Sequence, residues 1–276
     1  MNRLSTQRRI QIVSALVEGA GINAVARMTG VSNHTVLKLL ADMGQAAADY
    51  QDRTLRNLPC KRIQCDEIWS FCLMKDRNLP EELKGTFGVG SVWTWTAICA
   101  DTKLIPSWLV GERSAPYAEK FISDLAGRLA HRVQLTTDGH RPYLEAVEGA
   151  FGSEIDYAML IKLYSTPPTG NETRYSPSEC CGTRTQKING NPDERKISTS
   201  FVERHNLQMR MSLRRFTRLT NAHSKKIQNH IHAIAMYMLY YNFARIHSSL
   251  RVTPAMAAGI ADHAWSIEEM VLLLRR

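Results

Sequence analysis

The sequence predicts an α/β protein in which a mixed-sheet domain follows a small all-α domain. Up to about residue 43, the apolar residues recur only at helical spacing. After residue 60, segments rich in apolar, aromatic and β-branched residues alternate with helical ones, which predicts a sheet covered by helices. The length of 276 residues allows two domains at most, and 44% apolar with 22% charged residues is ordinary for a folded globular protein.

The N-terminal segment has the pattern of a helix-turn-helix unit. Helical spacing predicts helices over 6–17, 22–29 and 33–43, and Gly30 lies in the tight turn before the third helix. Ser32 is a suitable N-cap for that helix. The residues expected to face the major groove of DNA are Asn33, His34, Thr35 and Lys38. The alternative is a three-helix packing unit with no role in DNA binding.

The rest of the chain divides into a linker, a sheet domain and a tail. We assign 1–43 to the helix-turn-helix domain, 44–59 to a partly helical linker, 60–258 to the mixed α/β domain and 259–276 to a helical tail. The expected strands are 62–73, 86–100, 103–110, 134–137 and 155–164, and the expected helices are 116–129, 142–150, 198–215 and 221–245. Prolines and glycines predict a long irregular insertion over 165–197.

Positive charge is concentrated near the end of the sheet domain. Nine Lys and Arg residues and a single acid, Glu203, lie within 201–251, so this segment carries +8 of the formal net charge of +9. Such a surface suits the phosphates of a polyanion, although a solvated helix face is the alternative. The basic residues that we expect to contact DNA are Arg204, Arg210, Arg214 and Arg215.

Other features exclude several classes of protein. No run reaches the roughly 18 apolar residues that a membrane helix needs, and the polar, basic start does not resemble a secretory signal. Six cysteines are too few for a disulfide scaffold, so we expect reduced thiols and a cytoplasmic, nucleoid-associated protein without a membrane partner.

Three acids stand where carboxylates that hold a divalent metal could converge. Asp66 lies inside an apolar strand, Asp138 ends the fourth strand, and Glu203 lies near the start of a helix. A buried carboxylate is costly unless it is paired or bound to metal, and Mg²⁺ prefers oxygen ligands. A plain Asp-Gly turn at Asp138 and a capping box from Ser200 to Glu203 are the alternatives. Glu67 should point to the opposite face from Asp66, so we expect only one of the two at the site.

These residues resemble the three acidic blocks of DDE transposases, and among them the family named after the first bacterial insertion sequence. The matching blocks are CDEIWSF at 65–71, TDGHRPY at 137–143 and FVERHNL at 201–207, with a tail of YNF at 241–243 and HSSLRVTP at 247–254. The resemblance implies an RNase H-like fold, with Asp66, Asp138 and Glu203 as catalytic ligands of two Mg²⁺ ions, or of Mn²⁺. It also implies DNA cleavage and strand transfer without a covalent protein–DNA intermediate, and Arg210 matches the basic position after the family's glutamate.

The sequence also departs from this family. Members often carry a cysteine-based zinc finger before the helix-turn-helix, but no cysteine precedes Cys60 here, so we expect no N-terminal zinc site. The adjacent Cys180 and Cys181 lack the spacing of a zinc site.

The sequence therefore predicts an insertion-sequence transposase that binds terminal inverted repeats of double-stranded DNA as a homodimer or larger oligomer. The rival hypotheses are a non-catalytic helix-turn-helix regulator derived from a transposase and a nuclease that cannot join strands.

Overall fold

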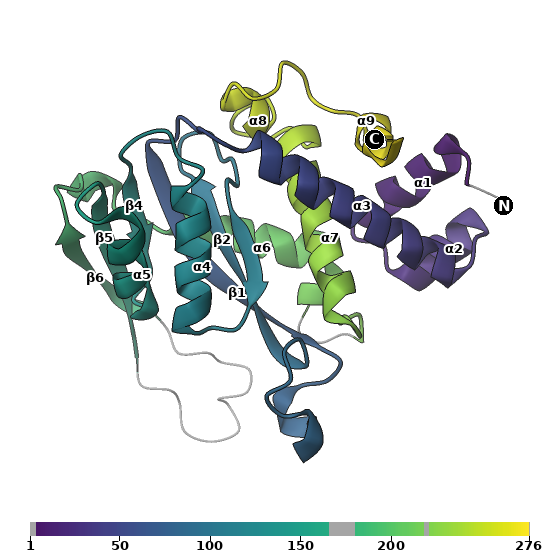
Figure 1. Cartoon of the computed structure of the whole chain (residues 1–276), viewed down its shortest axis with the longest axis horizontal. Coiled ribbons are helices and arrows are strands. Elements are labelled where there is room, and N and C mark those ends of the chain that lie inside the picture. Colours follow the sequence, from purple (N-terminus) through teal and green to yellow (C-terminus); the bar gives the residue numbers. More distant parts are fainter. Residues whose placement is uncertain (1–3, 166–179, 218–220, 276) are drawn as a thin grey trace.

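The computed structural model describes residues 4–165, 180–217 and 221–275 and contains a six-stranded mixed sheet with helices on both faces (Figure 1). The strand order is β3-β2-β1-β4-β5-β6. The strands are β1 Arg62–Cys72, β2 Gly90–Cys99, β3 Trp108–Gly111, β4 Gln134–Thr137, β5 Asp156–Tyr164 and β6 Cys180–Asn189. The predicted α/β class with a mixed sheet is confirmed.

Strand β1 is the centre of the sheet. It pairs with β2 in antiparallel register from Ile63 opposite Cys99 to Cys72 opposite Gly90. Its parallel pairing with β4 covers only the first three residues of β1, from Arg62 to Gln64. Strand β4 ends at Thr137, one residue after its last residue paired with β1, so the segment that follows it lies beside a stretch of β1 to which it is not paired.

Helices cover both faces of the sheet. The helices are α1 Thr6–Val17, α2 Ile22–Thr29, α3 Asn33–Thr54, α4 Ala115–Ala126, α5 Pro142–Phe151, α6 Ser200–Ser212, α7 Ile227–Leu239, α8 Pro254–Ala257 and α9 Ile267–Leu272. In Figure 1, α4 and α5 lie together in front of the sheet, while α6 packs on β1 and β2 from behind. As the spacing predicts, Ile227, Ile234, Met238 and Tyr241 pack on one side of the α7 segment in a common core.

The N-terminal helices follow the sequence expectation as secondary structure. Helix α2 ends at Thr29 and is followed by Gly30, whose left-handed φ of +66° is readily adopted only by glycine. Ser32 then caps α3 by accepting a hydrogen bond from the Thr35 backbone N–H. Both α1 and α3 pack on α2. Of the described helices, none is long and apolar enough to span a membrane.

The expected linker at 44–59 is mostly helix. Helix α3 continues from the predicted end at residue 43 to Thr54 and packs along α7. Met43, Ala47 and Gln51 are buried one turn apart, and the Gln51 side-chain amide donates to the Ala235 carbonyl of α7 at 3.1 Å. The helix continues because its second half has its own buried face. The N-terminal helices and the sheet domain consequently share one hydrophobic core.

Further expectations differ from the structure, among them the helix expected over 221–245, which begins only at Ile227, and the strand expected over 86–100, which begins only at Gly90. The predicted strand at 103–110 begins only at Trp108, because Pro106 cannot donate a ladder hydrogen bond. The predicted irregular insertion at 165–197 contains β6, a strand antiparallel to β5, while 166–179 lie outside the described residues. The predicted C-terminal tail contains α9, which packs on α1.

Helices α3 and α7 approach each other closely at Gly44, which leads to a prediction about stability. A Cβ at Gly44 would lie 2.3 Å from the His232 Cβ and 2.5 Å from its Cα. Gly44→Ala should lower the free energy of unfolding by about 1–3 kcal/mol, because the two helices must move apart. Chemical denaturation measures this change. Gly149→Ala on α5, where a Cβ meets nothing within 4 Å, is the control and should be neutral or stabilising. Equal stability of the two variants would contradict the close packing.

Candidate metal centre

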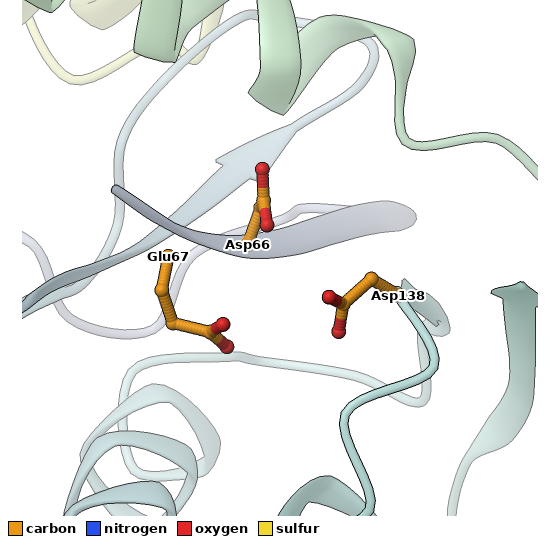
Figure 2. Close-up of side chains that lie close together, drawn as sticks. All are labelled: Asp66, Glu67 and Asp138. Carbon is orange, nitrogen blue, oxygen red and sulfur yellow. The ribbon is translucent and has the colours of Figure 1, made fainter. Parts of the chain in front are cut away.

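Three carboxylates converge where the pairing of β1 with β4 ends. Asp66 and Glu67 come from β1 and Asp138 follows β4, and one oxygen of each lies within 4.8 Å of the other two. Figure 2 shows Asp66 and Glu67 leaving β1 on opposite sides, with Asp138 beside the strand and turned toward both. Asp138 lies level with the unpaired part of β1, so it is close to side chains of both faces. The expectation that only Asp66 or Glu67 could reach the site is therefore wrong.

Burial and mutual repulsion make Asp66 and Glu67 unusually weak acids. Burial, followed by the charge of Asp138, raises the pKa of Asp66 to about 6, with a smaller contribution from the charge of Glu203. The same two causes raise the pKa of Glu67 to about 7, although Tyr143 and Arg113 oppose the shift. The Glu67 side chain is only 1% exposed. Clustered hard oxygen donors that repel one another in little water fit a divalent cation such as Mg²⁺.

Hydrogen bonds hold the three side chains in place. The Asn206 side-chain amide on α6 donates to Asp66 Oδ2 at 2.8 Å, and the His140 backbone N–H donates to Asp138 Oδ1 at 2.9 Å. Arg113, in the loop between β3 and α4, donates from Nε to Glu67 Oε2 at 3.1 Å. Its Nη2 also contacts Asp138 Oδ2 at 3.5 Å. The site therefore contains a basic side chain already paired with two of the three acids.

Glu203 lies on α6 outside this cluster. Its Oε2 forms an ion pair with Lys162 Nζ of β5 at 2.5 Å, and its Oε1 accepts a hydrogen bond from the Thr199 hydroxyl. The predicted alternative of a capping box with Ser200 is not formed, since Thr199 is the N-cap and its side chain makes no capping bond. Asn206 follows one turn later and reaches Asp66, so α6 touches the carboxylate cluster through Asn206 and influences it through the charge of Glu203.

The residues that we expect to contact DNA lie in two regions. At the start of α3, Asn33, His34 and Lys38 are exposed, while Thr35 is half-buried against the Ser32 hydroxyl at 2.9 Å.

Around α6, Arg204 and Arg214 are exposed and Arg210 is half-buried. Arg215 differs from these residues. Its Nη1 donates to Ser224 Oγ at 2.6 Å, and burial lowers its pKa to about 10, which indicates a structural ion rather than a surface contact. Arg218 of the basic segment lies outside the described residues.

Sequence reasoning missed Glu67, Arg113 and Lys162 as parts of this region. Strand alternation argues against Glu67, which approaches Asp138 because β4 ends before Asp138 and leaves that part of β1 unpaired on this side. Arg113 and Lys162 come from a loop and from the fifth strand, and no motif or spacing connects them with the acids.

Comparison with protein-family models and with curated proteins finds no match. Among solved structures, the chain is similar to a piggyBac transposase, determined by cryo-electron microscopy as a synaptic complex with hairpin DNA. The TM-score is 0.43 and the sequence identity 10%, over 99% of this chain and 71% of that chain.

The raised carboxyl pKa values predict how stability depends on pH. Without metal, folded Asp66 and Glu67 keep protons that the unfolded chain has released, so their contribution to stability is lost as the pH rises from about 4 to 7. Glu67→Gln should remove about 2–3 kcal/mol of this loss, given about 1.4 kcal/mol per pKa unit. Urea denaturation in EDTA across this pH range measures the effect. The exposed Glu148→Gln on α5 is the control and should follow the wild type. An identical pH dependence for Glu67→Gln would contradict the raised pKa.

Proposed function

We propose that this protein is an insertion-sequence transposase that cleaves DNA strands and joins them to new sites with divalent metal. The observation that supports this most is the meeting of Asp66 and Asp138, because two separate strands bring together the first two acids expected of a DDE enzyme. The order of the sheet and the position of α6 beside β1 are compatible with an RNase H-like fold.

In this proposal Asp66, Asp138 and Glu203 are the metal ligands. Two Mg²⁺ ions, or Mn²⁺, would stabilise the attacking and leaving oxygens of the phosphodiester when bound. Asn206 fixes the Asp66 carboxylate, and the His140 backbone N–H fixes Asp138. Glu203 is half-exposed and forms an ion pair with Lys162, so its carboxylate can bind metal at the same centre once that ion pair is broken.

The rest of the surface fits a duplex DNA partner. Exposed polar and basic side chains at the start of α3 would contact base edges and phosphates of the element ends, as a recognition helix does. Arg204, Arg210 and Arg214 lie on or just after the helix that carries Glu203, where they would hold phosphates beside the metal centre. Two element ends must be brought together, which favours a homodimer or a larger oligomer on DNA, in the nucleoid.

The catalytic assignment predicts that loss of one acid separates cleavage from binding. Asp66→Asn or Asp138→Asn should lower Mg²⁺-dependent cleavage of element-end DNA by a factor of about 10³ or more, because the metal loses a ligand. Binding of the same DNA in EDTA should stay within a few-fold of the wild type. Gel assays of cleavage and of joining measure both steps. Asp156→Asn is the control, because it removes a carboxylate of β5 that is paired with Arg132. Wild-type cleavage by either site variant would refute the assignment, while binding without cleavage by the wild type would favour the regulator.

The recognition role of α3 makes a separate prediction. Lys38→Gln should weaken binding to element-end duplex and reduce the slope of log affinity against log salt by about one, since one phosphate contact is lost. Fluorescence anisotropy at several salt concentrations measures the slope. Arg195→Gln, at an exposed position of the 3₁₀ turn Glu194–Lys196, is the control and should leave the slope unchanged. Equal effects of the two substitutions would place the DNA elsewhere.

A further inference from the structure

Arg113 occupies an unusual position among the carboxylates. Its guanidinium contacts Glu67 Oε2 at 3.1 Å and Asp138 Oδ2 at 3.5 Å, and it therefore bridges two of the three acids. Its carbon Cζ also lies 5.0 Å from the centre of the Trp93 ring on β2. The side chain is 37% exposed, whereas the Glu67 side chain beneath it is 1% exposed.

The bridge has a clear electrostatic purpose in the metal-free protein. Three carboxylates with oxygens within 4.8 Å repel one another, and burial strengthens that repulsion. Arg113 places one positive charge next to two of these carboxylates. The same Asp138 carboxylate is needed by a divalent ion, and a guanidinium beside that ion would repel it.

We propose that Arg113 is a positioning residue that acts as a placeholder cation: it holds Asp138 beside Glu67 until a divalent ion takes its place at Asp138. The inference rests on the proposed function, which requires a divalent ion at these carboxylates. The Trp93 ring lets the exchange occur without loss of every contact, because the guanidinium can stay over the ring while it leaves Asp138. The released side chain then lies beside the metal centre, where it can form an ion pair with a DNA phosphate.

This exchange has two consequences that can be measured. Metal binding in the absence of DNA is weakened by competition with Arg113, so removal of the positive charge should tighten it. DNA should also favour metal binding, since a phosphate that draws Arg113 away removes the competitor. A purely structural role predicts the opposite sign, because loss of a supporting side chain would loosen the ligands and weaken metal binding.

The test measures Mn²⁺ affinity of the full chain by electron paramagnetic resonance, without DNA. Arg113→Gln should bind Mn²⁺ roughly tenfold more tightly than the wild type, the size expected of one charge a few ångströms from a divalent ion even under water-like screening. Arg113→Lys keeps the charge and should stay within about threefold of the wild type. Arg132→Gln is the matched control. It breaks the ion pair of Arg132 with Asp156 at the start of β5, away from the cluster, and should leave Mn²⁺ affinity unchanged.

A second neutral variant guards against misfolding. Arg113→Met keeps apolar contact with Trp93 and should show the same tighter binding if Arg113→Gln does not fold. Addition of an element-end duplex should then tighten Mn²⁺ binding more in the wild type than in the folded neutral variant. A folded neutral variant with unchanged or weaker Mn²⁺ affinity would overturn the inference.

The two proposals fail in different ways. Wild-type protein that binds Mn²⁺ in competition with Arg113 but cuts no DNA would overturn the proposed function and leave the placeholder role intact. Wild-type protein that cuts DNA with Mg²⁺, while the neutral Arg113 variants bind Mn²⁺ as the wild type does, would overturn the placeholder role alone.

Discussion

The candidate site depends on the early end of the pairing between β1 and β4, because β4 stops at Thr137. Parallel pairing between these strands ends at Gln64, two residues before Asp66. If pairing continued, Asp138 would lie in the ladder and could face only one side of the sheet. Because the pairing stops before Asp66, Asp138 instead approaches both Asp66 and Glu67, which leave β1 on opposite faces. The result is a cluster of three carboxylates, with Glu67 buried and Asp66 and Asp138 partly buried, whose repulsion must be offset by Arg113 and by any metal that the site binds.

This constraint explains why the surroundings of the site are so well connected. Arg113 from one loop bridges Glu67 and Asp138, Asn206 on α6 holds Asp66, and the His140 backbone N–H from another loop holds Asp138. Lys162 does the same for Glu203 on α6. A group that is both buried and repelled by its neighbours adopts one position only when hydrogen bonds define it. The residues around the acids therefore fix the positions of the carboxylates as well as supporting the sheet.

Much of this arrangement was predictable from the sequence, and the exceptions have physical causes. Apolar spacing was sufficient for the first three helices and for the α7 segment, because each buries a face of its own, and apolar and aromatic content was sufficient for the buried strand β1. The continuation of α3 past residue 43 was not predictable from that segment, since its buried face is completed by α7. The approach of Glu67 to Asp138 depends on strand pairing, and the roles of Arg113 and Lys162 depend on tertiary contacts that no local pattern encodes. The place of Glu203 was predicted as a helix position, but its pairing with Lys162 was not.

The central claim is that the carboxylate cluster beside the end of β4 forms a divalent metal centre. Anomalous diffraction from crystals of the full chain grown with Mn²⁺ tests it most directly. The account predicts an anomalous peak in contact with Asp66 and Asp138, with the guanidinium of Arg113 no longer bridging Glu67 and Asp138. Crystals saturated with Mn²⁺ that show no peak there, and an Arg113 bridge still in place, would contradict it.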